Sequence, residues 1–178
     1  FRNLTARQHV RERIGMYMGS SSKEDIERFI LGEWKKTTYV PALSKMVDEI
    51  LDNSIDEAIR TNFKFANKID VSINSNKITV TDNGRGIPQD KIFDEAMQTE
   101  ILRPVAAWNG TEVSFVPDFE LFEVDSLDQL DTIILIEDRL ISLQMAFPEI
   151  QFSFNKKKIA VNNFKKYTEM FSDISIME

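Results

Sequence analysis

The stretch of sequence that decides the fold is Glu49-Ile50-Leu51-Asp52-Asn53-Ser54-Ile55-Asp56-Glu57-Ala58. It lies inside a longer segment, from about Tyr39 to Arg60, in which apolar residues recur at the spacing of an α-helix. The spacing predicts a long amphipathic helix with an apolar side made of Leu43, Met46, Val47, Ile50, Leu51, Ile55, Ala58 and Ile59. The opposite side carries Lys45, Glu49, Asp52, Asn53 and Asp56.

The polar side of this helix has residue types that suit phosphate chemistry. Glu49 is a carboxylate that can take a proton from water as a general base. Asn53 lies one turn later on the same side, and its amide oxygen is a ligand of the kind that Mg²⁺ takes together with water and phosphate oxygens. A charged helix face is more often a plain solvated surface, so this pattern alone leaves both interpretations open.

A second informative stretch is Asp82-Asn83-Gly84-Arg85-Gly86-Ile87-Pro88, which follows a predicted hairpin. The hairpin is indicated by alternating apolar residues on either side of the turn at 74–76, namely Ile69, Val71, Ile73, Ile78 and Val80. The two glycines indicate unusual backbone torsions or the close approach of a ligand, and a tight turn after a strand explains them too. Asp82 can accept a hydrogen bond from an adenine amino group, which is a donor.

The remaining segments predict an α+β fold in which helices pack on one face of a mixed, largely antiparallel sheet. Residues 1–22 indicate a polar, irregular arm, and residues 23–34 a short helix or an exposed segment. Further elements are expected as a helix over 91–103, a strand over 112–116, a helix over 127–146, and a second hairpin whose strands contain Phe152 and Phe154, then Ile159 and Val161.

The composition narrows the class of protein. A chain of 178 residues with 42% hydrophobic and 29% charged residues indicates one globular domain, with at most a small appendage. It has no cysteine and one histidine, which excludes disulfides, thiolate metal sites and a histidine-rich metal centre. The net charge of −7 argues against strong DNA binding by this domain itself. No stretch approaches the roughly 20 apolar residues that span a membrane, so we expect a cytoplasmic protein without a membrane partner.

The two informative stretches, in this order, resemble the GHKL ATPase superfamily, which includes gyrase, the Hsp90 chaperones, mismatch-repair ATPases and histidine kinases. Within it, Arg13-Ile14-Gly15-Met16-Tyr17-Met18-Gly19 resembles a segment of the type IIA DNA topoisomerases, and so does the strand that begins at Gly110-Thr111. Phe152-Ser153-Phe154-Asn155 and Asn163-Phe164-Lys165-Lys166-Tyr167 resemble segments of the topoisomerase large subunits of T-even bacteriophages. The resemblance covers nearly the whole chain and implies the gyrase B-like ATP-binding sandwich called the Bergerat fold.

The resemblance implies a role for each matching residue. Glu49 would be the general base that activates the attacking water, and Asn53 would bind the Mg²⁺ that bridges the ATP phosphates. Asp82 would accept a hydrogen bond from the adenine amino group, with Asn83 as a second candidate, and Thr111 would support the same hydrogen bonds. The walls around the adenine would be formed by Gly84, Gly86, Ile87, Pro88 and, on the far side, Ile101.

Two further roles follow from the resemblance. Arg85 and Glu57 would form an ion pair at the rim of the pocket, and Tyr17 would belong to an arm, residues 1–22, that crosses into a partner subunit. Each residue also has a plainer interpretation, as a surface ion pair for the first two and as packing for Tyr17. Thr111 is a residue type that strands favour in any case.

The sequence departs from the family pattern at two places. Lys45 stands where the gyrases have a histidine near the catalytic glutamate, so the orientation of Glu49 is expected to differ. The family also has a lid and a glycine-rich turn that wraps the phosphates, whereas here Trp108 is followed directly by Asn109. A lid-sized segment is therefore expected to be missing there from the ATP-binding domain, residues 23–178. The transducer domain that follows in the family is absent too, so this fragment should bind adenine-site ligands better than it hydrolyses ATP.

The leading hypothesis is the ATPase (N-gate) domain of a type IIA topoisomerase, in which ATP binding closes a homodimer through the N-terminal arm and hydrolysis drives DNA strand passage. The expected partners are ATP or an adenine-pocket inhibitor, the other topoisomerase subunits, and DNA held by the full assembly. For a phage-encoded protein the expected location is the host bacterial cytoplasm. Two alternatives stay open: another GHKL ATPase of chaperone or mismatch-repair type, and a lidless module that binds or dimerises without hydrolysis.

Overall fold

The computed structural model describes residues 5–86, 109–161 and 163–170. Its helices are α1 Ala6–Glu12, α2 Ile14–Tyr17, α3 Pro41–Arg60, α4 Thr132–Ala146 and α5 Phe164–Glu169, with a short 3-10 helix at Leu127–Gln129. Its strands are β1 Glu24–Ile30, β2 Glu33–Tyr39, β3 Lys68–Asn74, β4 Lys77–Asp82, β5 Thr111–Phe115, β6 Gln151–Phe154 and β7 Lys157–Lys158.

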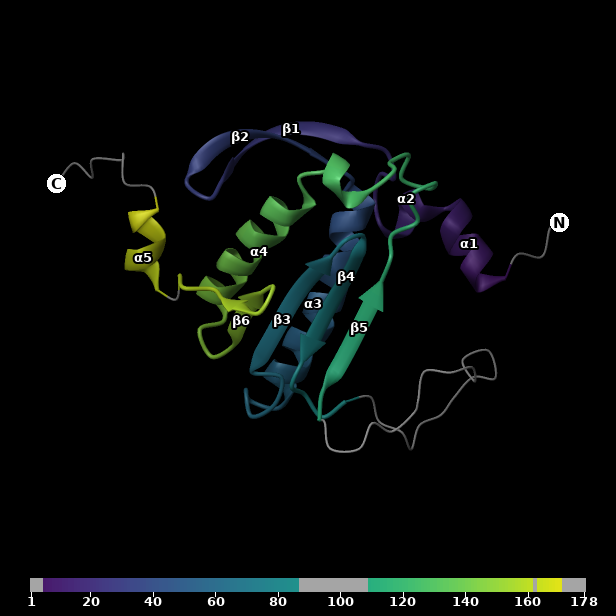
Figure 1. Ribbon diagram of the computed structural model, residues 1–178. Helices are drawn as coiled ribbons and strands as arrows, with labels where there is room; N and C mark the ends of the chain where they lie inside the picture. Colours follow the sequence, from purple (N-terminus) through teal and green to yellow (C-terminus); the bar gives the residue numbers. More distant parts are fainter. Residues whose placement is uncertain (1–4, 87–108, 162, 171–178) are drawn as a thin grey trace.

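The main sheet of the described residues has five strands in the order β5-β4-β3-β6-β7 (Figure 1). Neighbouring strands run antiparallel, except that β3 and β6 are parallel. The long helices α3 and α4 lie on one face of this sheet, and a separate hairpin of β1 and β2 arches over α4 (Figure 1). The predicted α+β class, with helices on one face of a mixed sheet, is therefore confirmed.

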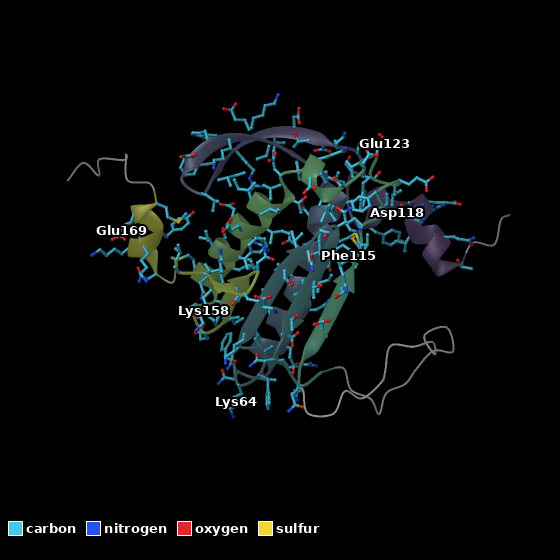
Figure 2. All side chains as sticks on the ribbon, in the orientation of Figure 1. Lys64, Phe115, Asp118, Glu123, Lys158 and Glu169 are labelled. Carbon is cyan, nitrogen blue, oxygen red and sulfur yellow. The ribbon has the colours of Figure 1, made fainter. Side chains whose placement is uncertain are left out.

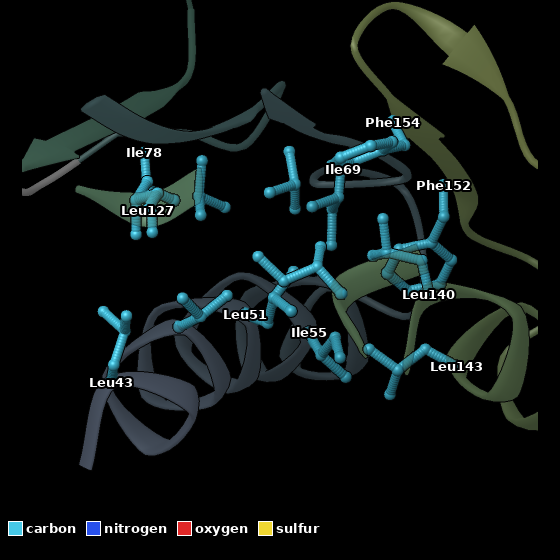
Figure 3. Packing of buried hydrophobic residues seen from close by; sticks show 14 of the residues in the cluster. Leu43, Leu51, Ile55, Ile69, Ile78, Leu127, Leu140, Leu143, Phe152 and Phe154 are labelled. Atoms are coloured by element: carbon cyan, nitrogen blue, oxygen red, sulfur yellow. The ribbon is translucent and has the colours of Figure 1, made fainter. Parts of the chain in front are cut away.

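The core lies between the sheet and the two long helices, as Figure 3 shows. Leu43, Leu51 and Ile55 of α3 point toward Ile69 and Ile78 of the sheet, and all five side chains are almost completely buried. Burying an aliphatic side chain of this size contributes about 1.5–3 kcal/mol. This apolar layer holds α3 against the sheet and leaves its opposite side, with the polar residues, facing outward.

Helix α3 matches its prediction closely, beginning at Pro41 and ending at Arg60. Proline suits the first turn, because an N–H at that position has no partner inside the helix anyway. The hairpin of β3 and β4 is confirmed as well, because the predicted alternation buries Val71, Ile78 and Val80 on the helix side. Strand β5 begins one residue earlier than predicted, at Thr111.

The prediction for the N-terminal part is wrong at two places. Residues 1–22 contain the helices α1 and α2 instead of an irregular arm, because Thr5 and Gln8 form a capping box at the start of α1. Residues 23–34 belong to the β1–β2 hairpin and form neither a helix nor a loose segment. This hairpin turns at Leu31 and Gly32, which have φ angles of 49° and 88°.

Two predictions near the C-terminus need smaller corrections. The helix expected over 127–146 is broken, and α4 itself begins at Thr132 after an extended residue at Leu130. The second hairpin is shorter than expected, since Asn155 and Lys156 turn the chain at once with positive φ angles and β7 covers only Lys157–Lys158.

The helix expected over 91–103 lies outside the described residues. In the described ranges, no helix combines the length and apolarity needed to cross a bilayer.

Candidate functional site

The side chains of interest gather at one end of the sheet, where β4 ends and β5 begins. Lys64 marks this end of the molecule in Figure 2, and Phe115 and Asp118 mark the opposite end of β5. The register pairs Asp82, the last residue of β4, with Thr111, the first residue of β5. The long-range pairing of these strands therefore brings together two residues that lie 29 positions apart in the sequence.

Asp82 is the central polar group of this end of the sheet. Its side chain is buried, with 5% of the residue exposed. Its Oδ1 accepts hydrogen bonds from the backbone N–H of Gly84 at 2.7 Å and of Thr111 at 3.3 Å. Its Oδ2 accepts a hydrogen bond from the Ser54 hydroxyl at 2.8 Å. A buried carboxylate is costly unless such donors surround it, and here the turn after β4, strand β5 and helix α3 supply them.

Ser54 is a member of this site that the sequence analysis missed. It lies on the apolar side of α3 and is 6% exposed. The available signal was a small polar residue in line with Val47, Leu51 and Ala58, which follow one another at helical spacing and are all buried. A hydroxyl on a buried helix stripe needs a hydrogen-bond partner, and only the tertiary fold shows that Asp82 is that partner.

Gly84 is required by the close packing around Asp82. A Cβ atom at position 84 would lie 2.7 Å from Oδ1 of Asp82, 3.2 Å from Cγ of Glu57 and 3.5 Å from Cβ of Ala66. Gly86 has a φ angle of 82°, and a Cβ there would lie 3.3 Å from the carbonyl oxygen of Gly110. Both glycines thus allow the chain to pass close to its neighbours, and Gly86 has the unusual backbone torsion that the sequence pattern indicated.

The side chain of Asn83 forms its hydrogen bonds with residues in and next to β3, away from Asp82. Its amide oxygen accepts a hydrogen bond from the backbone N–H of Lys68 at 2.8 Å, and its NH₂ group donates to the side-chain oxygen of Asn67 at 2.9 Å. These bonds attach the end of β4 to the start of β3. The structure therefore brings Thr111, and not the Asn83 side chain, to the carboxylate of Asp82.

The polar side of α3 presents Glu49 and Asn53, which are both exposed. The side chain of Glu49 is 49% exposed, and its Oε1 lies 2.6 Å from Nζ of Lys45, one helical turn earlier. This hydrogen bond raises the pKa of Lys45 above its ordinary value. Lys45 thus contacts Glu49 at the position where the sequence departs from the gyrase pattern, and a lysine here orients the carboxylate by a salt bridge.

Glu57 connects α3 to the turn that follows β4. Arg85 Nε donates to Glu57 Oε1 at 2.7 Å, and Arg60 donates to Oε2 of the same carboxylate. The hydrogen bond from Arg85, followed by that from Arg60, lowers the pKa of Glu57 from 4.5 to about 2. The guanidinium of Arg85 also lies 6.0 Å from the ring centroid of Phe65. The pair expected between Arg85 and Glu57 is present in the structure.

The remaining candidate residues are Tyr17, which the structure describes, and three residues that it does not describe. Tyr17 ends α2, is 49% exposed, and its hydroxyl lies 3.3 Å from Nδ1 of His9. Ile87, Pro88 and Ile101 lie outside the described residues. The described residues contain no group of three or more His, Cys, Asp or Glu side chains placed to hold a metal ion.

Comparisons with known proteins agree with this arrangement. The pattern of the family described as histidine kinase-, DNA gyrase B- and HSP90-like ATPase matches residues 38–117. The chain is 37% identical over 237 residues to the DNA topoisomerase large subunit of Enterobacteria phage T4, covering 96% of this chain and 45% of that protein. It is 43% identical over 95 residues to the DNA gyrase B protein of Borrelia hermsii, covering 53% of this chain and 12% of that protein.

Solved structures show the same fold. The ATPase region of Saccharomyces cerevisiae topoisomerase II superposes with a TM-score of 0.75 at 21% identity, covering 96% of this chain and 64% of that chain. The ATPase domain of Thermus thermophilus gyrase B gives a TM-score of 0.59 at 22% identity, covering 85% of this chain and 49% of that chain. The chain spans less than half the length of the curated relatives named above. From its sequence and its fold together, the chain belongs to the histidine kinase-, DNA gyrase B- and HSP90-like ATPases, in the branch of the type II DNA topoisomerases.

Proposed function

We propose that this chain is the ATP-binding and hydrolysing N-gate domain of a type IIA DNA topoisomerase, in which nucleotide binding and hydrolysis drive dimer closure and DNA strand passage. The observation that carries the proposal is the buried Asp82 carboxylate, held by α3 and β5 at the end of the sheet. The same helix that supplies Ser54 also presents Glu49 and Asn53, which are exposed. One helix thus links an acceptor suited to adenine with residues suited to phosphate chemistry.

In this proposal the residues of α3 act on the phosphates. Glu49 takes a proton from the attacking water, and Asn53 would hold a Mg²⁺ through its amide oxygen. A bound Mg²⁺ supplies charge neutralisation at the phosphates. Lys45 competes with water for the Glu49 carboxylate, because the two side chains form a salt bridge at 2.6 Å. Lys45 is therefore expected to set the orientation of the base.

The adenine ring would lie against the turn after β4. Asp82 accepts a hydrogen bond from the amino group, supported by Thr111, and Gly84 and Gly86 allow the ring to approach the backbone. The ion pair of Arg85 and Glu57 stands at the rim. We also assign Ile87, Pro88 and Ile101 to the adenine walls on the resemblance alone, with Asn83 as an alternative acceptor whose side chain is bound to β3.

We propose a domain organisation with an arm at residues 1–22 and an ATP-binding domain at 23–178 that lacks a lid between 108 and 109. The alignment with the phage T4 protein supports a missing segment. It extends over 237 residues, whereas 96% of a 178-residue chain is about 171 residues, so about 66 positions have no counterpart here. The six glycines of the chain do not form the phosphate-wrapping turn of the family either. The missing segment and the missing turn favour, as a second candidate, a lidless module that binds or dimerises without hydrolysis.

The partners in the full enzyme are proposed from the same branch. Tyr17 is exposed at the end of α2 and would contact the second protomer of a homodimer. DNA and further topoisomerase subunits would be bound by the complete assembly, in the cytoplasm of a host bacterium if the protein is phage-encoded. The similarity to the topoisomerases disfavours a chaperone or mismatch-repair function.

Calorimetric titration of the chain and of Asp82→Ala tests the proposal, with a non-hydrolysable ATP analogue and an adenine-pocket inhibitor as ligands. Losing a hydrogen bond to a buried charged group weakens binding by about 1.5–3 kcal/mol, which is roughly ten- to a hundredfold. Asp131→Ala is a matched control, because the Asp131 carboxylate also accepts a backbone N–H bond, from Thr38 at 2.7 Å, in another part of the molecule. If the unaltered chain binds neither ligand, the proposed function is wrong. Binding of the inhibitor alone would favour the second candidate.

A further inference from the structure

The acceptor positions of Asp82 are unequally occupied by the described residues. Oδ1 accepts from the N–H groups of Gly84 and Thr111, whereas Oδ2 accepts from the hydroxyl of Ser54. A carboxylate offers about four acceptor positions. Counting the described donors, the position that remains for a ligand is therefore on Oδ2, beside Ser54.

Ser54 also helps to hold the plane of the carboxylate. Rotation about χ2, an angle that is broadly populated for aspartate, moves both oxygens together, so donors on both oxygens restrict it from opposite sides. The hydrogen bond from Ser54 at 2.8 Å pins the second oxygen. Because Ser54 is 6% exposed and stands on the rigid helix α3, its hydroxyl does not depend on a mobile surface rotamer.

We infer that Ser54 is a positioning residue for base recognition, which aims the remaining acceptor position of Asp82 at the amino group of a 6-aminopurine. This inference rests on the proposed function and deepens it. An acceptor in that place rejects a 6-oxopurine, because two acceptors then face each other without a proton between them. A site built to hydrogen-bond one ligand group discriminates strongly against ligands that lack it.

The role of Ser54 in base recognition is tested by changing one group in the protein and one group in the ligand, separately and together. The chain and Ser54→Ala are titrated with a non-hydrolysable ATP analogue and with the same analogue carrying unsubstituted purine, which has no amino group. Ser54→Ala weakens binding of the adenine analogue about tenfold, and it changes binding of the purine analogue less than about twofold. The variant is expected to fold, because alanine is the best helix former.

Thr37→Val is the matched control. Thr37 is 2% exposed, and its hydroxyl donates to the backbone oxygen of Ile26 within the β1–β2 hairpin. This variant loses a buried hydroxyl elsewhere and leaves the ratio of the two affinities unchanged. Equal weakening of both analogues by Ser54→Ala, or no weakening of either, overturns the inference. If the unaltered chain does not bind the adenine analogue, the proposed function itself fails, which is a separate outcome.

Discussion

At the scale of single residues, the site depends on how closely Asp82 is surrounded. Its carboxylate is buried and contacts donors from α3, from the following turn and from β5. Such an arrangement tolerates few changes in shape, because a displaced carboxylate would lose several hydrogen bonds together. Gly84 is the neighbour with the least free space, since a Cβ there would lie 2.7 Å from Oδ1 of Asp82.

Replacing Gly84 with alanine is therefore expected to disturb the site directly. The new methyl group must displace Asp82 or Glu57, so we expect Gly84→Ala to lower the free energy of unfolding by about 1–3 kcal/mol. It should also weaken binding of a non-hydrolysable ATP analogue. Urea denaturation and calorimetry measure the two effects.

Gly15 provides the matched control for this substitution. A Cβ at position 15, in α2, would meet no atom within 4 Å. Gly15→Ala should therefore leave stability unchanged or raise it by up to about 1 kcal/mol. Equal effects of the two substitutions would show that the packing around Asp82 is looser than the structure indicates.

At the scale of elements, α3 is joined to the β4 turn by more than apolar packing. Glu57 near the C-terminal end of α3 accepts hydrogen bonds from Arg85 in the turn and from Arg60 in its own helix. Helix α3 thus places Ser54 beside the carboxylate of Asp82 and Glu57 beside the guanidinium of Arg85. The hairpin of β1 and β2 forms another such connection, because Asp131 before α4 accepts from the backbone N–H of Thr38 in β2.

The acid stability of this connection follows from Glu57. Its pKa is lowered from 4.5 to about 2 in the folded protein, so the unfolded chain binds the proton more readily. The stabilisation is thus fully present above pH 4.5 and is lost as the pH falls from 4.5 toward 2. We expect it to be about 1–2 kcal/mol, because Arg85 and Arg60 are half exposed or more and water screens them.

Urea denaturation of the chain and of Glu57→Gln, at several pH values from 7 to 2.5, measures this contribution. The difference in unfolding free energy between the two proteins should be constant near neutral pH and should shrink below pH 4.5. A difference that does not change with pH would mean that the ion pair contributes nothing to stability.

At the scale of the whole molecule, the net charge limits what the chain does alone. The charge is −7, and binding to the DNA backbone requires the neutralisation of phosphates by Lys and Arg. We therefore expect this chain by itself to bind duplex DNA more weakly than the roughly 10⁻⁴–10⁻⁶ M that is typical of non-specific DNA-binding proteins at physiological salt.

Fluorescence anisotropy with a labelled duplex at about 0.15 M salt tests this expectation. Repeating the titration at lower salt separates a weak electrostatic contact from no contact, because phosphate contacts strengthen steeply as salt falls. Tight, salt-resistant binding would show that this domain binds DNA itself. The proposal that the complete assembly supplies the DNA contacts would then be wrong.

The sequence by itself determined the elements whose pattern is local. The apolar spacing of α3, the alternation of β3 and β4, and the glycines after Asp82 each follow from contacts within a short segment, so the helix, the hairpin and the turn were predictable. The β1–β2 hairpin was not, because its buried residues, Ile30 and Thr37, are few and follow no clear alternation along their strands.

Only the tertiary structure decided which groups surround Asp82. Ser54 and Thr111 reach it from positions 28 and 29 residues away, through the packing of α3 and the pairing of β4 with β5. A sequence pattern indicates which face of a helix or strand is buried, but it does not say which buried groups meet. Ser54 stands among the apolar side chains of the helix, and only the packing of that helix on the sheet shows its hydrogen bond to Asp82.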